Sequence, residues 1–146
     1  MIRKRMLQVC VTLLFIAGVV DFMRGVAHTF RVRYAATHIA KIDPTADSLV
    51  LMGSFGISNF LTAFIYILIV FRARKLAPYI LLLIPLSYAL GILGLIGYQN
   101  VVLESEFNGQ YMMQYYLIIC AAAGLLYFIT PQFKRSKGKS ASQGMG

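Results

Sequence analysis

Four long runs of apolar residues, separated by polar connections, dominate the chain. They cover about residues 6–26, 49–71, 78–98 and 111–129. A helix needs about 20 apolar residues to cross the hydrocarbon core of a bilayer, where no water satisfies an exposed backbone. The pattern therefore predicts an all-α integral membrane protein, built as an up-down bundle of four transmembrane helices.

Proline and capping residues mark where these helices begin. Asp43 followed by Pro44 is typical of an N-cap and a first helical position, so we expect the second helix to begin there, outside the membrane. Pro78 opens the third helix in the same way. The link at 72–77 is short, which predicts an antiparallel hairpin of the second and third helices.

Two further prolines and the tail complete the domain organisation. Pro85 lies inside the third span, where a missing backbone donor predicts a kink. Pro131 ends the fourth helix. We therefore expect one transmembrane domain at 1–133, followed by a basic, Ser/Gly-rich and disordered cytoplasmic tail at 134–146.

The distribution of charge predicts how the chain is oriented. Of the 14 Lys and Arg residues, ten lie at the N-terminus, in the second connection and at the C-terminus, whereas all five acids lie in or beside the first and third connections. Positive residues in short loops stay in the cytoplasm. Both termini are therefore expected inside a bacterial-type plasma (inner) membrane, with the acids and both histidines near the outer face.

The net charge of +9 has a simple reading in this context. The basic residues flank the apolar spans, where they set topology and contact anionic lipid head groups. They form no stripe along a polar face, so nucleic acid is not expected as a partner. The expected partners are the lipid bilayer, another membrane protein or a second copy, and a lipophilic small molecule.

The N-terminus and the cysteines exclude some classes of protein. The basic N-terminal residues and the apolar run that follows could imitate a secretory signal, but the run continues into Asp21 without a convincing cleavage site. We read it as an uncleaved anchor. Cys10 and Cys120 lie inside apolar spans without a CxxC motif, so burial is expected and a dithiol or zinc site is not.

Small residues predict how the helices pack. Membrane helices associate through close approach at small side chains and through interhelical hydrogen bonds. Stripes of this kind occur in the last three spans, namely Ser54, Ser58 and Thr62 with Gly53, Gly56 and Asn59, then Ser87, Gly91 and Gly94, and finally Cys120 to Gly124. Each is a plausible contact stripe of a compact bundle.

The most specific local pattern is a polar stripe near the outer end of the first span. Asp21, Arg24, His28 and Arg31 are spaced by three, four and three residues. They share one helical face if the helix continues that far. Asp21 falls about one turn inside the hydrocarbon, where a charged residue tends to face the bundle and to pair, so Arg24 is its expected partner.

Two interpretations of this stripe remain open. It could be one wall of a polar pocket at the outer mouth, able to bind a carbonyl, a phosphate or a quinone head group. Alternatively, Asp21 and Arg24 form a structural ion pair and the other polar residues solvate an interface. The candidate ligand-binding residues are Asp21, Arg24, His28, Arg31, Asn59, Tyr98, Glu104, Glu106 and Gln114.

Sharper kinds of chemistry receive less support. A metal site could use His28, His38, Glu104 and Glu106, but the histidines are ten residues apart and do not match HxxxH. Haem lacks a histidine from a facing helix. Proton transport would have Asp21 as its sole carrier in the spans, and no hydrolytic triad is evident. The sequence assigns no catalytic residue and no cofactor.

The leading functional hypothesis is therefore non-enzymatic. We expect a small multi-pass membrane protein that acts as an accessory subunit or binds a lipophilic ligand in a polar pocket at its outer mouth. The alternative is a membrane enzyme or redox subunit that acts on a quinone- or lipid-like substrate at the same mouth.

Overall fold

The computed structural model describes residues 2–99 and 108–130, with side chains described except at 108–110. Apart from short connections, this part of the chain is helical. The elements in chain order are α1 (Ile2–Phe30), α2 (Val32–Tyr34), the π-helical η1 (Ala35–Ala40), α3 (Ala46–Arg72), the 3₁₀ turn η2 (Arg74–Leu76), α4 (Ala77–Ile92), the π-helical η3 (Leu93–Tyr98) and α5 (Asn108–Ile129).

Four helical stretches are long and apolar enough to cross a membrane. They are Ile2–Phe30, Ala46–Arg72, Arg74–Tyr98 and Tyr111–Ile129. The predicted all-α architecture with four such helices is confirmed. The first two helices are longer than predicted, because their ends continue into polar residues that the hydropathy pattern alone leaves out.

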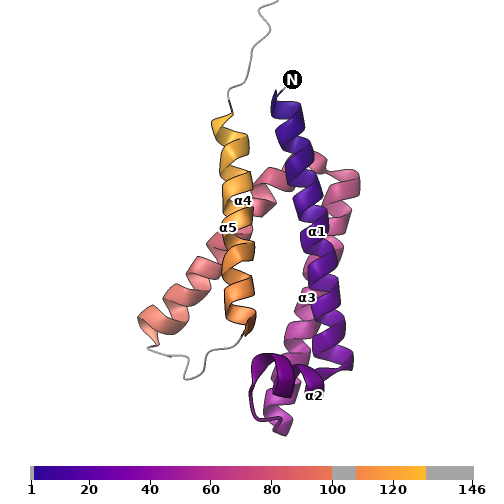
Figure 1. The fold of residues 1–146 in the computed structure, drawn as a ribbon, viewed down its shortest axis with the longest axis vertical. Helices are drawn as coiled ribbons and strands as arrows, with labels where there is room; N and C mark the ends of the chain where they lie inside the picture. Colours follow the sequence, from indigo (N-terminus) through magenta and orange to yellow (C-terminus); the bar gives the residue numbers. More distant parts are fainter. Residues whose placement is uncertain (1, 100–107, 131–146) are drawn as a thin grey trace, which may run out of the picture.

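The four helices alternate in direction and form two closely packed pairs (Figure 1). α1 lies beside α3 along most of its length, and α4 packs against α5. α1 also contacts both α4 and α5 and so joins the pairs. The start of α1 and the end of α5 lie at the same end of the molecule, and η1 sits beneath α1, α3 and α5 at the other.

A regular seam joins α1 to α3. On α1, Cys10, Leu14, Ala17 and Asp21 are buried at spacings of four, three and four residues. On α3 the buried set Gly56, Ala63, Tyr66 and Val70 follows spacings of seven, three and four. This 3.5-residue repeat is that of helices packed with knobs in holes. Asp21 therefore occupies a position within the seam that would ordinarily be apolar.

The beginning of α3 differs from the predicted one. The N-cap is Thr45, whose hydroxyl accepts a hydrogen bond of 3.3 Å from the Ser48 amide. The Ser48 hydroxyl in turn donates to the Asp43 carbonyl at 2.6 Å. The prediction of Asp43 as cap and Pro44 as first helical residue was wrong by two positions, because Thr45 also places a side-chain oxygen over the free amides. Pro78, by contrast, lies in the first turn of α4 as predicted.

The second and third spans run in opposite directions, as predicted, but they do not pack along each other. The link is short, as expected, but α4 leaves α3 obliquely and crosses behind α5 (Figure 1). The reason is where α4 buries its first turns: Ala77, Pro78 and Leu81 enter the core with residues of α1 and α5. Beyond Pro85 the helix is largely exposed. We call residues 86–98 the α4 arm.

Two of the predicted contact stripes are only partly used. Ser54 and Ser58 are exposed and donate to carbonyls of their own helix, whereas Gly56 of the same span is buried. On the α4 arm, a Cβ placed at Gly91 or Gly94 would have no described atom within 4 Å beyond its own turn of helix. In α5 the prediction holds at Cys120, which is buried, and at Gly124. Cys10 is also buried, and its thiol lies 3.6 Å from the Ala123 carbonyl oxygen.

The close approach of α1 and α3 at Gly56 makes a first prediction. A Cβ at Gly56 would overlap Thr29 Oγ1 and lie 3.0 Å from the Thr29 amide nitrogen. Gly56→Ala should therefore force the helices apart and destabilise the protein by about 1–3 kcal/mol, measured by thermal unfolding in mild detergent.

The matched control lies one turn away on the same helix. At Gly53 nothing lies within 4 Å of an added Cβ, so Gly53→Ala should cause no loss of stability. Equal losses in the two variants would contradict the seam at Gly56.

Candidate functional site

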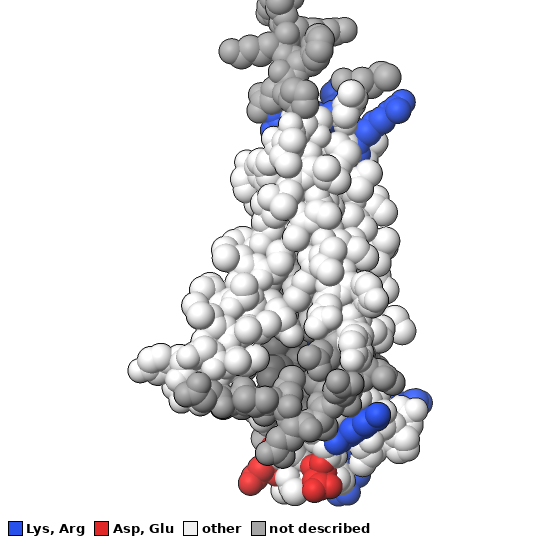
Figure 2. All heavy atoms as spheres, turned by 60° about the vertical axis from the view of Figure 1, so that its left-hand side comes forward, with Lys and Arg blue, Asp and Glu red and all other residues white. Residues whose placement is uncertain are grey.

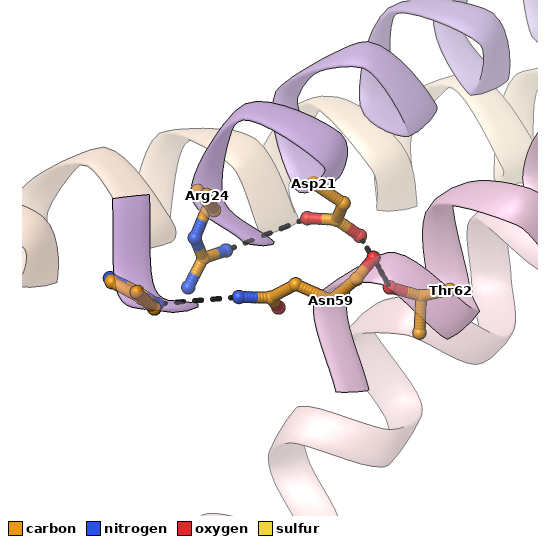
Figure 3. A network of polar contacts seen from close by, with 5 residues as sticks. Asp21, Arg24, Asn59 and Thr62 are labelled. Atoms are coloured by element: carbon orange, nitrogen blue, oxygen red, sulfur yellow. Dashed lines mark hydrogen bonds and ion pairs between the residues drawn. The ribbon is translucent and has the colours of Figure 1, made fainter. Parts of the chain in front are cut away.

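The polar stripe of α1 meets polar side chains of α3 in a network between the two helices (Figure 3). Asp21 is 6% exposed. Its Oδ1 lies 3.7 Å from Arg24 Nη1 in an ion pair one turn apart. Its Oδ2 accepts a hydrogen bond of 3.1 Å from the Thr62 hydroxyl of α3. The two carboxylate oxygens thus have partners on different helices.

The Thr62 hydroxyl has two acceptors within reach. It lies 3.1 Å from Asp21 Oδ2 and 3.0 Å from the Asn59 carbonyl oxygen of its own helix. A hydroxyl has one proton to donate. Hydrogen bonds to an ionised acceptor are roughly twice as strong as neutral ones. The Thr62 hydroxyl therefore donates to a charged Asp21 in preference to the Asn59 carbonyl. Thr62 is therefore the hydrogen-bonded link between Asp21 and α3.

A second interhelical contact lies one turn further along α1. The Asn59 side-chain amide is 3.4 Å from His28 Nδ1, a long hydrogen bond in which the imidazole nitrogen accepts if it carries no proton. Asn59 and Thr62 lie three residues apart and present one face to α1. The network thus spans two turns of α1, from Asp21 to His28, and one turn of α3, from Asn59 to Thr62.

The structure confirms the predicted face for three of the four stripe residues. Asp21, Arg24 and His28 lie on continuous helix, and the predicted pair of Asp21 with Arg24 is present. Arg31 lies outside α1, at a backbone break with φ −125° and ψ 38°, and is exposed. The helix ends at Phe30, so the condition for adding Arg31 to the face is not met.

The opposite wall of the predicted pocket is assembled only at Asn59. Tyr98, at the end of η3, is 82% exposed, and Gln114 is exposed on α5. Neither makes a polar contact with the network in the part of the chain that the structure describes. Glu104 and Glu106 lie outside the described residues. The described members of the set therefore form an interhelical network and do not converge on one cavity.

The sequence did not reveal the core residues that lie inward of the polar network. Tyr66 of α3 and Cys120 of α5 belong to the same buried core, and Tyr116 packs against it. The Tyr116 hydroxyl is buried, makes no hydrogen bond of good geometry among the described residues, and faces the Tyr66 hydroxyl and the Cys120 thiol. The available signal was weak: Tyr66 follows Thr62 by one helical turn.

The two histidines have separate surroundings. His28 faces Asn59, whereas His38 lies in η1, where its Nδ1 is 2.7 Å from the Thr37 hydroxyl and its ring stacks on Tyr34 at 4.5 Å. Among residues 2–99 and 108–130, no three His, Cys, Asp or Glu side chains gather closely enough to hold a metal ion. The described arrangement supports interhelical hydrogen bonding and charge pairing.

The Asp21–Arg24 pair makes a second prediction. Asp21→Ala and Arg24→Ala should each lower the unfolding temperature in mild detergent, and the two losses should sum to more than that of the double variant. The reason is that each single change leaves one charge without its partner. The expected coupling is about 0.5–2 kcal/mol. Additive losses would contradict the pairing, and Arg33→Ala, at an exposed position, is the control for loss of one positive charge.

Comparison of the chain with protein-family models, with curated proteins and with solved structures gave no match. The described residues offer a hydrogen-bonded network between α1 and α3, an exposed α4 arm and a buried tyrosine hydroxyl that makes no hydrogen bond of good geometry.

Proposed function

We propose that the protein is a non-catalytic accessory subunit of the plasma (inner) membrane, with both termini in the cytoplasm. In this proposal the α4 arm packs against a transmembrane helix of another subunit. The excess of Lys and Arg at the ends of the chain and in the second connection supports the orientation. The observation that carries the proposal is the exposed stripe of small residues on the arm.

The stripe has the features of an interface that lacks its partner. Among the described residues nothing fills the space where a Cβ would stand at Gly91 and Gly94, and Ser87 is exposed one turn before Gly91. Lipid tails are as apolar as leucine, so apolar exposure alone does not favour a protein partner in a bilayer. Small residues do favour one, because they let a second backbone approach closely enough for extensive van der Waals contact.

The direction of the arm adds to this argument. α4 is tied to α5 and α1 at its beginning but extends away from α1 and α3 at its end (Figure 1). The exposed fractions of Leu90, Leu93 and Leu95 are 60%, 67% and 59%. A helix that leaves its own bundle with a small-residue face uncovered is arranged to contact another helix.

Site-specific photocrosslinking in the cell that naturally produces the protein tests this proposal. A photoreactive residue at Gly91 should give a crosslinked product of defined mass, identified by mass spectrometry as another membrane protein. The control is the same residue at Leu93, which is 67% exposed and lies about 160° round the helix. A product at Leu93 and not at Gly91, or none at either, would contradict the proposal. A second copy at Gly91 would replace the accessory role with self-association.

A second candidate is the binding of a lipophilic ligand that carries a carbonyl, such as a quinone-like molecule. The observation that favours it is the buried Tyr116 hydroxyl, which makes no hydrogen bond of good geometry among the described residues and packs against a core that also holds Tyr66 and Cys120. A buried hydroxyl that makes no hydrogen bond lowers stability, and a ligand carbonyl would accept its proton. The same site would serve the alternative of a redox subunit.

Native mass spectrometry from mild detergent tests this second candidate. A bound ligand should appear as a defined extra mass on the protein, and Tyr116→Phe should remove it while thermal unfolding in detergent stays close to that of the parent chain. Tyr115→Phe, at a position that is 69% exposed, should retain the mass. A bare protein, or an extra mass equal in both variants, would contradict ligand binding at Tyr116.

A further inference from the structure

An open groove lies at the end of the molecule that carries the N-terminus, far from the Asp21 network. Its volume is about 760 Å³, and it runs between the first turns of α1 and the 3₁₀ turn η2. The residues that line it are Lys4, Leu7, Gln8, Val11, Thr12 and Arg74. Five of these residues come from α1 at spacings of three, one, three and one, so they form one continuous face of that helix.

The lining combines cations, polar groups and an apolar wall. Lys4 and Arg74 are exposed and provide the cations, with Lys4 nearest the end of the helix. Gln8 and Thr12 offer an amide and a hydroxyl. Leu7 and Val11 are half-buried against the core and form the apolar wall. With a rise of 1.5 Å per residue, the groove extends about 12 Å from Lys4 to Thr12 along α1.

The cations at this end have no acidic counterpart in the described part of the chain. Figure 2 shows blue side chains and no red ones there, whereas red and blue occur together at the opposite end. Arg74 uses its Nε to donate to the Val70 carbonyl at 2.9 Å, which orients its two terminal nitrogens without occupying them. Arg3, by comparison, lies with its guanidinium 4.9 Å from the ring centre of Tyr127. Lys4 and Arg74 are thus available to an external anion.

We propose that this groove binds an anionic phospholipid. The phosphate lies between Lys4 and Arg74, and one acyl chain runs along Leu7 and Val11. The cations suit the anionic head group of such a lipid, and the half-buried apolar wall suits its chain. Basic pockets between membrane helices bind anionic head groups in this way. A soluble anion would leave the apolar wall without a partner.

Tryptophan fluorescence offers a direct test, because the chain contains no tryptophan. Gln8→Trp places the fluorophore in the groove, and Val9→Trp places it at the neighbouring residue, 45% exposed and about 100° round the helix. Each variant is reconstituted with phospholipids brominated on their acyl chains, which quench nearby tryptophan. Brominated phosphatidylglycerol should quench Gln8→Trp with at least about fivefold higher apparent affinity than brominated phosphatidylcholine, since a juxtamembrane cation contributes about that factor. Val9→Trp should show no such preference.

Replacing the two cations tests whether the preference for phosphatidylglycerol arises in the groove. Lys4→Ala with Arg74→Ala in the Gln8→Trp background should abolish this preference. The matched control is Arg5→Ala with Lys75→Ala, which removes the same charge from adjacent residues that do not line the groove, and should leave the preference intact. Unchanged thermal unfolding in a zwitterionic detergent shows that each variant is folded. Lys4→Gln alone, at an exposed position, should weaken the preference while Arg74 is kept.

Three results would overturn the proposal. The first is an equal lipid preference at Gln8→Trp and Val9→Trp, which would indicate only a charged annulus. The second is a loss of preference in the Arg5 and Lys75 control as large as in the Lys4 and Arg74 variant. The third is relief of quenching by millimolar inorganic phosphate, which would assign the groove to a soluble anion.

Discussion

The buried carboxylate of Asp21 is the constraint on which the arrangement of α1 and α3 depends. A charged residue within a membrane-spanning helix costs roughly 2.5–3.5 kcal/mol at the centre of the span, and that cost is reduced when the residue faces the bundle and is paired. Asp21 must therefore point inward, which fixes the rotation of α1 about its axis. Arg24 reaches it from the next turn and Thr62 from the facing helix, so the same requirement also fixes which face of α3 is opposite.

Close packing makes this hydrogen bond possible. A Thr hydroxyl is short, and it reaches Asp21 only because the two backbones approach each other at Gly18, Gly25 and Gly56. At Gly25 an added Cβ would lie 2.8 Å from the Phe60 ring, and at Gly18 it would lie 3.4 Å from Tyr66 Cβ. The seam of α1 keeps its spacing through Asp21, so the polar network occupies positions in the same repeat as Cys10 and Leu14. In lipid, apolar burial gives helices little driving force to associate. The hydrogen-bonded network and the close packing at the glycines therefore hold α1 and α3 together.

Features within a single helix are predictable from the sequence, whereas contacts between two helices are less so. The four apolar spans, the shared face of Asp21, Arg24 and His28, and the ion pair follow from hydropathy and from 100° per residue. The partner Thr62 and the neighbour Tyr116 do not, because spacing along α1 carries no information on which helix lies opposite. Tyr98 was assigned to the site on the assumption that all outward helix ends converge, but α4 diverges from α3 after η2. Its early residues Ala77 and Leu81 pack with α1 and α5, and this choice of partner sets the direction of the rest of the helix.

The two ends of the bundle therefore differ in whether their polar side chains have partners within the protein. At the Asp21 end, the members of the interhelical network have partners within the chain, so the residues with the strongest chemical signature in the sequence are occupied in joining two helices. At the N-terminal end, Lys4 and Arg74 face open space with no described acid nearby, and on the α4 arm no described helix packs against Gly91 and Gly94. Unmet interactions, rather than conspicuous residue types, indicate where a molecule from outside the chain gains most by binding. That criterion is the basis for proposing a bilayer lipid at the basic end and a helix at the arm as partners.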